Sequence, residues 1–520
     1  MGGSAELSGP DLAAGVSTDT VESGDKLLGH AFGEPVLLAR VGDEYFAVGA
    51  TCSHYGGPLA EGIIHGDEVR CPWHHACFDL RTGEAMRAPA LSPIPCYSVE
   101  QRDGRIVVTK KHERDPLSGS YPLPNRAVPG PRTVVIIGAG ASGTAAAEML
   151  RRCGFDGRIT IIDADTDSPY DRPNLSKDYL AGDAPEEWVP LRPEGFYEQH
   201  GIERLRTRAT KLDIPGRRVE IDGGKPVSYD ALLIATGANP VRLPLDGADQ
   251  PHVHYLRSLA DSRSIIAATK KAKRAVVAGA SFIGLEVAAS LRKRGLEVHV
   301  AAPDHLPLER VLGPELGTAI QRLHESHGVV FHLGRKPERI ERDAVVLDDG
   351  TRIPADLVVL GVGVRPRLAL VEDAGIALDH GVSVDEYLET SAPGVFATGD
   401  IARWPDPHTG ERIRVEHWVV AERMGQTAAR NILGARERYD FVPFFWSAHY
   451  DVTINYVGHA EHWDRIVTDG DADKRDFAAR FEQDGKLLAF ASIYRDTESL
   501  MVEVEMERRA AVSAHAPQPG

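Results

Sequence analysis

Four residues in a short N-terminal stretch have the types and the spacing of metal ligands. Residues 52–75 read CSHYGGPLAEGIIHGDEVRCPWHH, so Cys52 and His54 form one pair, and Cys71 and His74 form a second. Two such loops can supply two thiolates to one iron and two imidazoles to another, which is the ligand set of a Rieske [2Fe-2S] cluster. Zinc is the alternative, although zinc fingers usually pair Cys with Cys and His with His. We therefore predict a Rieske cluster, and we expect the adjacent His75 to face solvent.

Two glycine-rich boxes have the spacing of dinucleotide-binding turns. Residues 138–143 read GAGASG and residues 279–284 read GASFIG, each after an apolar run, and Ser281 stands where the second box should have its middle glycine. In a strand–turn–helix unit, such glycines let the backbone approach a pyrophosphate at the helix N-terminus. Two boxes indicate two nucleotide cofactors. After the strand that follows the first box, Asp163 or Asp165 should bind a ribose, and the sequence does not choose between them.

The elements that must position these residues can be read from apolar periodicity. Short alternating runs over 21–110 predict a small antiparallel β domain, and the Pro- and Gly-rich residues 111–131 predict a linker. From residue 132, apolar runs alternate with helical patterns, which is typical of parallel α/β units. Strand-rich texture over 441–512 predicts a C-terminal α+β domain. Residues 1–20 and 513–520 should be disordered.

Composition excludes several classes of protein. The net charge of -17 in 520 residues is spread along the chain, which argues against nucleic acid as a partner. The sequence has neither a run of about 20 apolar residues nor an N-terminal signal, so no membrane association is expected. Five cysteines are too few for a disulfide framework in a chain of this length. We expect a cytoplasmic protein, and the sequence leaves open whether it is a homo-oligomer.

Over residues 132–510 the chain resembles the flavin-dependent ferredoxin reductases of the pyridine-nucleotide-dependent class. The stretches that carry the resemblance are SPYDRPNLSKDYLAG, LLIATGANPVRLP, VVAGASFIGLEVAASL, VFATGDIA, VEHWVVAERMGQTAARNILG and VPFFWS. With its N-terminal segment, the whole chain resembles the Rieske-containing members of the apoptosis-inducing-factor-like family. The implied fold class is a multidomain protein: an all-β Rieske domain, two Rossmann-like, glutathione-reductase-like α/β domains, and an α+β domain. FAD would occupy residues 132–246 and 376–440, and NADH or NADPH residues 247–375.

The resemblance also implies the site residues. At FAD it places Gly138, Ala139, Gly140, Ala141, Ser142, Gly143, Arg172, Lys177, Ala235, Thr236, Gly237, Arg242 and Asp400, with Glu416, His417 and Trp418 lining the same pocket. At the nicotinamide nucleotide it places Gly279, Ser281, Phe282, Ile283, Gly284, Glu286 and Gly363. Lys177 and Glu286 would meet beside the flavin as a catalytic ion pair that tunes the flavin.

The implied activity is that of an NAD(P)H-dependent oxidoreductase. Electrons would pass from NADH through FAD to the fused cluster and on to a protein such as an oxygenase. The helix after the first box contains only Cys153, so no dithiol can relay the electrons. The alternative is a redox-sensing flavoprotein of apoptosis-inducing-factor type that acts through partner association. Ala302 stands where NADH-selective relatives place an acid, and the nearby Asp304 would repel a 2′-phosphate, so we predict NADH with reduced discrimination.

Overall fold

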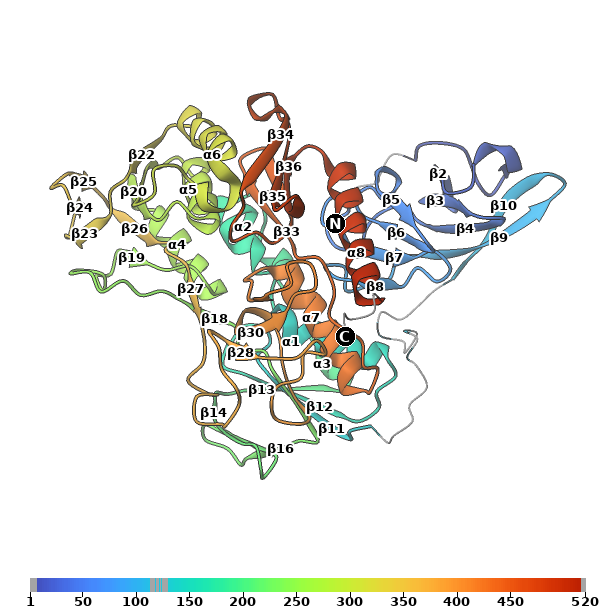
Figure 1. Cartoon of the computed structure of the whole chain (residues 1–520), viewed down its shortest axis with the longest axis horizontal. Coiled ribbons are helices and arrows are strands. Elements are labelled where there is room, and N and C mark those ends of the chain that lie inside the picture. Colours follow the sequence, from blue (N-terminus) through green and yellow to red (C-terminus); the bar gives the residue numbers. More distant parts are fainter. Residues whose placement is uncertain (1–6, 113–116, 118–120, 122, 124–129, 516–520) are drawn as a thin grey trace.

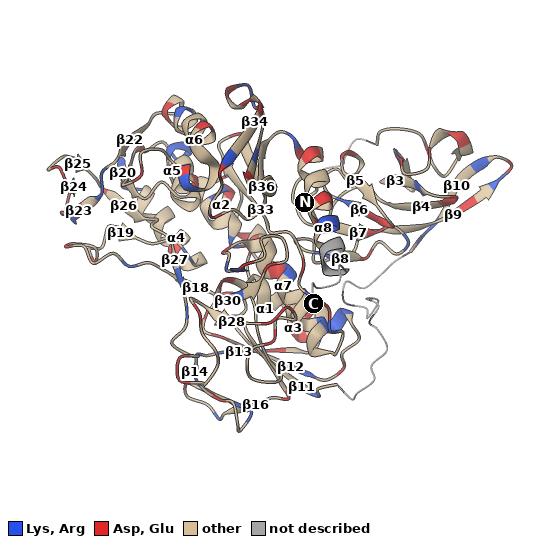
Figure 2. Cartoon of the chain, viewed as in Figure 1, with Lys and Arg blue, Asp and Glu red and all other residues tan. Residues whose placement is uncertain are grey.

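The structure is a computed structural model, and it describes residues 7–112, 117, 121, 123 and 130–515. Figure 1 shows a β-rich N-terminal part, two α/β units, and a C-terminal sheet followed by a long helix, α8 (Asp496–His515). The predicted fold class is thereby confirmed. Acidic and basic residues are interspersed over all of these parts (Figure 2). Among the described helices, none has both the length and the apolar character that a bilayer crossing requires.

The N-terminal domain contains two antiparallel sheets. The larger has the order β1-β10-β9-β4-β3-β2, and the smaller the order β5-β6-β7-β8. Their bounds are β1 (Val16–Ser17), β2 (Lys26–Ala31), β3 (Glu34–Val41), β4 (Glu44–Gly49), β5 (Ile63–His65), β6 (Glu68–Arg70), β7 (Cys77–Asp79), β8 (Ala85–Arg87), β9 (Cys96–Arg102) and β10 (Arg105–His112). The prediction of disorder over 1–20 is wrong for residues 7–20, because Leu12 is fully buried and Val16 pairs with Ile106.

The first α/β unit is a five-stranded parallel sheet of order β13-β12-β11-β17-β29. Its strands are β11 (Thr133–Ile137), β12 (Arg158–Asp163), β13 (Ile202–Arg206), β17 (Ala231–Ile234) and β29 (Val395–Ala397). Smaller elements here are α2 (Asp178–Ala181), α3 (Phe196–Gln199), β14 (Ala209–Asp213), β15 (Arg218–Ile221), β16 (Val227–Ser228), β28 (Val382–Ser383), β30 (Ala402–Pro405) and β31 (Arg412–Ile413). Because β29 comes from a distant segment, this unit is discontinuous in sequence, as the resemblance implies.

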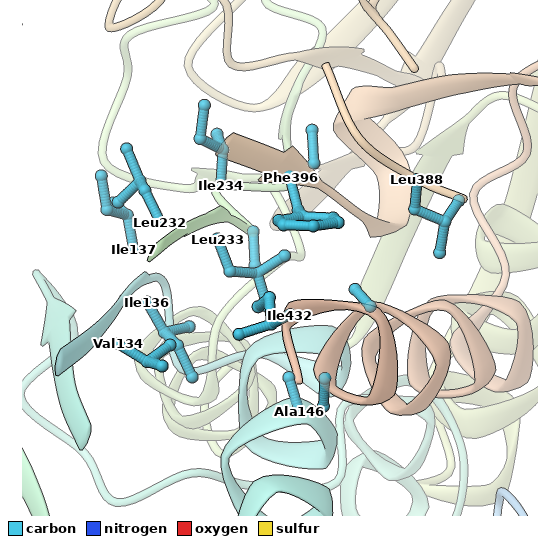
Figure 3. Packing of buried hydrophobic residues seen from close by; sticks show 14 of the residues in the cluster. Val134, Ile136, Ile137, Ala146, Leu232, Leu233, Ile234, Leu388, Phe396 and Ile432 are labelled. Atoms are coloured by element: carbon cyan, nitrogen blue, oxygen red, sulfur yellow. The ribbon is translucent and has the colours of Figure 1, made fainter. Parts of the chain in front are cut away.

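The core of this unit lies between the sheet and two helices, α1 (Ala141–Arg152) and α7 (Trp418–Ile432). Figure 3 shows Ile136 and Leu233 of the sheet packed toward Ala146 of α1 and Ile432 of α7. The small residues of α1 let the backbone of α7 approach closely: a Cβ added at Gly425 of α7 would lie 2.2 Å from the Ser142 carbonyl oxygen. Close packing of α1 against α7 thus holds together the two separate stretches of sequence that make up this first α/β unit.

The second α/β unit repeats the plan with a parallel sheet of order β19-β26-β20-β21-β22. Its strands are β19 (Val253–His254), β20 (Arg274–Ala278), β21 (Glu297–Ala302), β22 (Val329–Leu333) and β26 (Leu357–Leu360), and its helices are α4 (Leu259–Thr269), α5 (Phe282–Lys293) and α6 (Glu309–Ser326). A small sheet contains β23 (Pro337–Ile340), β24 (Ala344–Leu347) and β25 (Arg352–Pro354). The antiparallel pair β18 (Ala238–Pro240) and β27 (Val364–Pro366) forms the two connections to the first unit.

The C-terminal domain is an antiparallel sheet of order β32-β33-β36-β35-β34. Its strands are β32 (Phe444–His449), β33 (Val452–Gly458), β34 (Arg465–Asp471), β35 (Asp476–Gln483) and β36 (Lys486–Ile493). Helix α8 contacts this sheet and also β5 of the N-terminal domain (Figure 1). It continues to His515, past the boundary predicted at 512, and residues 516–520 lie outside the described residues. Most of the predicted linker 111–131 also lies outside them, although β10 continues to His112.

Candidate redox centre

The two predicted metal-ligand pairs lie together at the ends of two loops. Cys52 comes soon after β4 and Cys71 directly after β6, and their buried thiols are hydrogen-bonded to each other. The Nδ1 atoms of His54 and His74 face each other at 3.2 Å. The four side chains do not form a group of three or more ligands around one ion. They divide into a thiol pair and an imidazole pair, which is the division that a Rieske cluster requires.

Burial sets the protonation of these side chains. It lowers the pKa of His54 to about 3 and that of His74 well below its usual range, so both imidazoles are neutral, as metal ligands are. The hydrogen bond with Cys71, reinforced by burial, raises the pKa of Cys52, so binding of a cluster must release thiol protons. A Cβ at Gly57 would lie 2.7 Å from the Cys71 sulfur, so this loop leaves no room for a side chain beside the ligands. The residues present therefore fit a cluster.

The expectation that His75 faces solvent is wrong. The side chain is fully buried, its ring stacks on Phe444 at a centroid distance of 4.0 Å, and its Nδ1 donates to Glu503 Oε2 at 2.8 Å. His75 has a φ of 60°, in the left-handed region, whereas His74 has none of these contacts and turns toward His54. Adjacent residues thus point to opposite sides of the loop, and His75 faces the C-terminal domain.

A cavity of about 1230 Å³ opens at the N-terminus of α1, and a second of about 780 Å³ shares Gly140, Arg172, Ala235 and Gly237 with it. Of the predicted FAD residues, the first cavity also contains Gly138, Ala139, Asp163, Asp165 and Thr236. The second also contains Ala141, Ser142, Lys177, Asp400, Glu416, His417 and Trp418, together with Ser281, Phe282, Ile283, Glu286 and Gly363. The two cavities therefore bring most of the predicted FAD and nucleotide residues into one connected site.

The first glycine box has the geometry of a phosphate-binding turn. Gly138 has a φ of 105°, and a Cβ there would lie 2.4 Å from the Ala235 carbonyl oxygen. A Cβ at Gly143, which does not line the cavities, would lie 1.9 Å from the Gly138 carbonyl oxygen. Gly140 caps α1 without a side-chain hydrogen bond, so the N–H groups of the first turn remain for an anion. This turn fits the pyrophosphate of FAD.

Orphaned polar atoms in the cavity walls also fit a bound cofactor. Thr236 Oγ1 and His417 Nδ1 are buried and have no hydrogen-bond partner among the described residues, although both residues line the cavities. Buried polar groups are rarely left unpaired in a native protein, because each costs about 1–3 kcal/mol. Burial lowers the pKa of His417 to about 3, so its ring is neutral. A neutral ring can donate or accept at Nδ1 according to its tautomer.

Both candidate ribose-binding acids line the first cavity but differ in their partners. Asp163 ends β12 and lies 3.7 Å from the Arg204 guanidinium, and burial raises its pKa. Asp165 accepts a hydrogen bond from the Tyr170 hydroxyl at 2.8 Å. Asp163 and Asp165 thus lie in the same cavity wall, and either carboxylate remains a candidate to bind the ribose.

The structure does not bring Arg242 to either cavity. Its guanidinium lies over the ring of Tyr255, 4.5 Å from the centroid. Arg257 occupies the site instead: it lines both cavities, and its Nη2 donates to Asp400 Oδ2 at 2.6 Å. Arg172 donates from Nε to the Arg257 carbonyl oxygen at 3.1 Å, so the two arginines share one wall. Sequence reasoning missed Arg257 because no motif surrounds it.

The predicted ion pair between Lys177 and Glu286 is present at the second cavity. Lys177 Nζ lies 2.9 Å from Glu286 Oε2, and the two side chains are 14% and 4% exposed. Ser176 donates to the same carboxylate oxygen at 2.6 Å, and Ser447 of β32 donates to Oε1 at 2.6 Å. Two segments thus converge on one buried carboxylate, and both of its oxygens accept hydrogen bonds.

The second box differs from the first at its middle position. Gly279 has a φ of 110°, and a Cβ there would lie 2.4 Å from the Gly361 carbonyl oxygen. A Cβ at Gly284 would lie 2.3 Å from the Gly279 carbonyl oxygen, so these two glycines serve close packing and do not line the cavity. Ser281 accepts from the Gly284 N–H at 3.2 Å and caps α5. A serine is thus tolerated because its hydroxyl takes up one helix donor.

Trp446 of β32 lies between the imidazole pair and the second cavity. Its ring centroid is 4.2 Å from that of His74. The same side chain lines the cavity, where Lys177 Nζ lies 5.9 Å from the ring. One aromatic side chain therefore contacts a predicted cluster ligand on one side and the predicted flavin site on the other.

Two carboxylates of α8 hold the N-terminal domain against the rest of the chain. Glu503 is fully buried and binds Arg423 of α7 at 2.7 Å and His75 at 2.8 Å. Glu507 binds Arg70 at 2.8 Å and Arg87 at 2.5 Å, both from the N-terminal domain. Burial alone would raise the pKa of Glu503, but the neighbouring Arg423, His75 and Arg70 outweigh it and hold this pKa well below its usual range. The domain contact is therefore built on buried charge pairs.

Fold and site together define a nucleotide-dependent flavin oxidoreductase that carries a Rieske domain. Residues 132–425 match the pyridine nucleotide-disulphide oxidoreductase family, 14–98 the Rieske [2Fe-2S] domain, and 444–518 the reductase C-terminal domain. The chain belongs to the pyridine nucleotide-disulphide oxidoreductase family. This confirms the resemblance stated from the sequence and favours the cluster over zinc.

Related proteins are similar over most of their length. The chain is 32% identical to "Apoptosis-inducing factor 3" of Mus musculus over 91% of this chain and 80% of that protein. It is 38% identical to the "Biphenyl dioxygenase system ferredoxin--NAD(+) reductase component" of Paraburkholderia xenovorans (strain LB400), over 65% and 84%. The solved structure "Crystal structure of the covalent putidaredoxin reductase-putidaredoxin complex" is 32% identical with a TM-score of 0.71, and the match covers 73% of this chain and 93% of that one.

These findings establish the activity at the level of its class. The protein is an NAD(P)H-dependent flavoprotein reductase of the ferredoxin reductase type that uses FAD and a [2Fe-2S] cluster and transfers electrons to redox partners. Trp446 was present in the stretch VPFFWS but was not singled out, because an isolated tryptophan is usually a core residue. Its role becomes visible only from its contacts with His74 and Lys177, which come from distant segments of the chain.

Proposed function

We propose that electrons pass within one chain, from NADH through FAD to the fused Rieske cluster, and then to a protein acceptor such as an oxygenase. When bound, FAD accepts hydride and gives up electrons singly, and the cluster takes them one at a time. The observation that carries the proposal is the position of Trp446, in contact with His74 and in the wall of the second cavity. An aromatic bridge of this kind shortens the gap across which an electron must pass.

Each part of the site then has a role for this chain's residues. The first box and α1 would bind the FAD pyrophosphate, Asp163 or Asp165 a ribose, and Arg172 and Asp400 the rest of the cofactor. Cys52, His54, Cys71 and His74 would hold the cluster. Lys177 and Glu286 would orient the reacting rings, Lys177 as a cation near the flavin and Glu286 as its buried counter-ion. Trp418, Glu416 and His417 would exclude water from the same cavity.

Transfer in cis is supported by the buried contact between the domains. Glu503 and Glu507 bind Arg70, His75 and Arg87 of the N-terminal domain, and Glu503 and Arg423 are almost without exposure to solvent. Charges buried in this way remain paired only while the domains stay docked. The cluster would therefore remain beside Trp446 through the catalytic cycle, and tethering keeps its effective concentration high.

NADH is the proposed donor. Ala302 ends β21, where an acid would bind the adenosine ribose, and Arg310, the next cation along the chain, is paired with Asp304 at 2.9 Å. Asp304 would repel a 2′-phosphate, and both Arg310 and Arg335, which lies beside Ala302, already have carboxylate partners. The acceptor would be an oxygenase or another redox protein, because the relatives include reductase components of dioxygenase systems. A cytoplasmic location and the absence of nucleic acid and membrane partners remain predictions.

The test uses the holoprotein and two variants, Trp446→Phe and Trp446→Ala. Under anaerobic conditions, NADH should reduce the flavin at the same rate in all three. The rate of cluster reduction can be measured by electron paramagnetic resonance on rapidly frozen samples. It should be slowed most in Trp446→Ala and less in Trp446→Phe, which keeps an aromatic ring. In the native protein this step should be independent of protein concentration, as expected for transfer in cis.

Two results would contradict the proposal. Equal cluster reduction in all three proteins would remove Trp446 from the path, and a rate that rises with protein concentration would indicate transfer between chains. Turnover with an artificial one-electron acceptor should reach about 1 per second or more, as is usual for enzymes. Turnover far below this, with a change of oligomeric state on NADH addition, would instead support the redox-sensing alternative.

A further inference from the structure

A line of buried hydrogen bonds leads from Glu286 away from the second cavity. Ser447 Oγ donates to Glu286 Oε1 at 2.6 Å and lies 3.1 Å from His449 Nε2. His449 Nδ1 in turn lies 3.2 Å from His324 Nε2. Ser447, His449 and His324 are all fully buried. Ser447 and His449 lie two residues apart on β32, and therefore on one face of the strand, while His324 comes from α6.

The chemistry of each partner fixes the direction of these bonds. An ionised carboxylate only accepts, so the Ser447 hydroxyl proton must point to Glu286. The serine oxygen then accepts from His449 Nε2–H, which leaves His449 Nδ1 free to accept from His324 Nε2–H. Both imidazoles are neutral, because burial lowers the pKa of His449 to about 3 and that of His324 well below its usual range. Every hydrogen bond in the line therefore points toward Glu286.

The outer end of the line is an unprotonated nitrogen near the surface. In this arrangement His324 Nδ1 is a bare acceptor, and it is buried without a hydrogen-bond partner among the described residues. The His324 ring centroid lies 5.1 Å from that of Tyr450, which stacks at 3.7 Å on the exposed ring of His327. The orphaned nitrogen thus belongs to a ring that is separated from the exposed His327 ring by one side chain, that of Tyr450.

We propose that Glu286, Ser447, His449 and His324 form a proton relay between the surface near His327 and the flavin site. A proton from solvent forms an N–H bond at His324 Nδ1, while His324 Nε2–H breaks and His449 Nδ1–H forms. His449 Nε2–H then breaks as the serine takes this proton and passes its own to Glu286 Oε1. No electron moves, Glu286 becomes neutral, and every bond in the line reverses. The reverse sequence returns the proton and restores the original direction.

Such a relay would serve the reductase activity. The proposal rests on the position given to Glu286 under the proposed function. Hydride received from NADH adds one negative charge to a cavity whose wall already contains the Glu286 carboxylate. Like charges in a poorly solvated site raise the proton affinity of the carboxylate. A proton taken up by Glu286 offsets the new charge, and it is given back once both electrons have left.

The groups facing the relay are consistent with this role. Lys177 and Ser176 face Glu286 and stabilise its resting charge. Lys177 also acts on His449, and His449 and His327 act on His324, each disfavouring a second proton on the imidazole. The histidines therefore pass a proton on and do not retain it, and Glu286 is the only member that stores it.

The test measures proton uptake and not only turnover. The sample is the holoprotein with its cluster already reduced, so that electrons cannot leave the flavin. When NADH then reduces the flavin, a pH indicator in weak buffer should report the uptake of one proton by the relay. His449→Asn and His324→Gln should slow this uptake roughly a hundredfold, as expected for the loss of a positioned acid–base group, and remove its solvent isotope effect. FAD content and the cluster spectrum should be unchanged.

The matched control is His332→Asn. His332 Nε2 lies 3.0 Å from His299 Nδ1, so the chain offers a second pair of histidines joined from Nε2 to Nδ1, on β21 and β22. Among the described residues, neither histidine of that pair is hydrogen-bonded to Glu286, so the substitution should leave proton uptake unchanged. The relay is refuted if the native protein takes up no such proton, or if either relay variant takes it up at the native rate. Failure of NADH to reduce the cluster in the native protein would instead refute the proposed function.

Discussion

Replacing Glu503 by glutamine should weaken the attachment of the Rieske domain. The Glu503 carboxylate binds Arg423 at 2.7 Å and His75 at 2.8 Å, with Arg70 farther away at 3.8 Å. Glutamine keeps the size of the side chain but removes its charge. Arg70 retains Glu507, whereas Arg423 loses its carboxylate and keeps only carbonyl partners. The cost is therefore dominated by one uncompensated buried guanidinium.

Breaking a buried charge pair by removing one partner costs about 3–5 kcal/mol, so the free energy of unfolding should fall by that amount. The control is Glu505→Gln in the same helix, whose partner Arg509 lies four residues away on an exposed face. An exposed pair at this spacing contributes about 0.3–0.5 kcal/mol. Each variant removes one negative charge from the native protein, and the two sites differ in how deeply that charge is buried.

The lowered pKa of Glu503 gives the effect a pH dependence. A carboxyl whose pKa is lower in the folded state stabilises the fold above its unfolded pKa, which is about 4.3 for Glu. That contribution is lost as pH falls through this value toward the lower folded pKa. The stability difference between the native protein and Glu503→Gln should therefore be full at pH 7 and shrink in acid.

Chemical denaturation can be followed separately by the visible circular dichroism of the cluster and by flavin fluorescence. Glu503→Gln should lower the midpoint of the cluster transition most. A loss of 3 kcal/mol corresponds to roughly a 150-fold change in an equilibrium constant, so cluster reduction by the flavin should also slow. Equal shifts of a few tenths of a kcal/mol in Glu503→Gln and Glu505→Gln would refute the reasoning.

Three further predictions concern the reacting groups. Lys177→Ala should keep FAD bound but slow its reduction by NADH tenfold or more, a barrier change of about 1.4 kcal/mol; an unchanged stopped-flow rate would show that Lys177 does not act there. The cluster potential should lie near the lower end of the Rieske range, roughly -150 mV, because Ala76 and Phe78 offer no hydroxyl to its sulfurs. Ala76→Ser with Phe78→Tyr should raise it in a redox titration, and a native value well above zero would count against this. Steady-state kinetics should show a preference for NADH over NADPH, which a strong preference for NADPH would contradict.

The sequence by itself determined the local motifs. The ligand pairs, the first glycine box and the alternation of strands and helices depend on residue types within short segments, where turn geometry and periodicity act directly. Gly138 illustrates this, since its φ of 105° is a requirement of the turn that the box encodes. Lys177 and Glu286 were paired through family resemblance, which carries information about tertiary structure that the residues alone do not.

Only the tertiary structure decided which distant residues meet. It buried His75 against α8, although its neighbour His74 is turned the other way, because the loop packs between two domains. It placed Arg257 and not Arg242 beside Asp400, and it set Trp446 against His74. These contacts join segments far apart in the chain, and their side chains are of types that occur in many surroundings. No short-range rule of propensity or spacing selects among such partners, because the packing of whole domains sets which side chains come within reach.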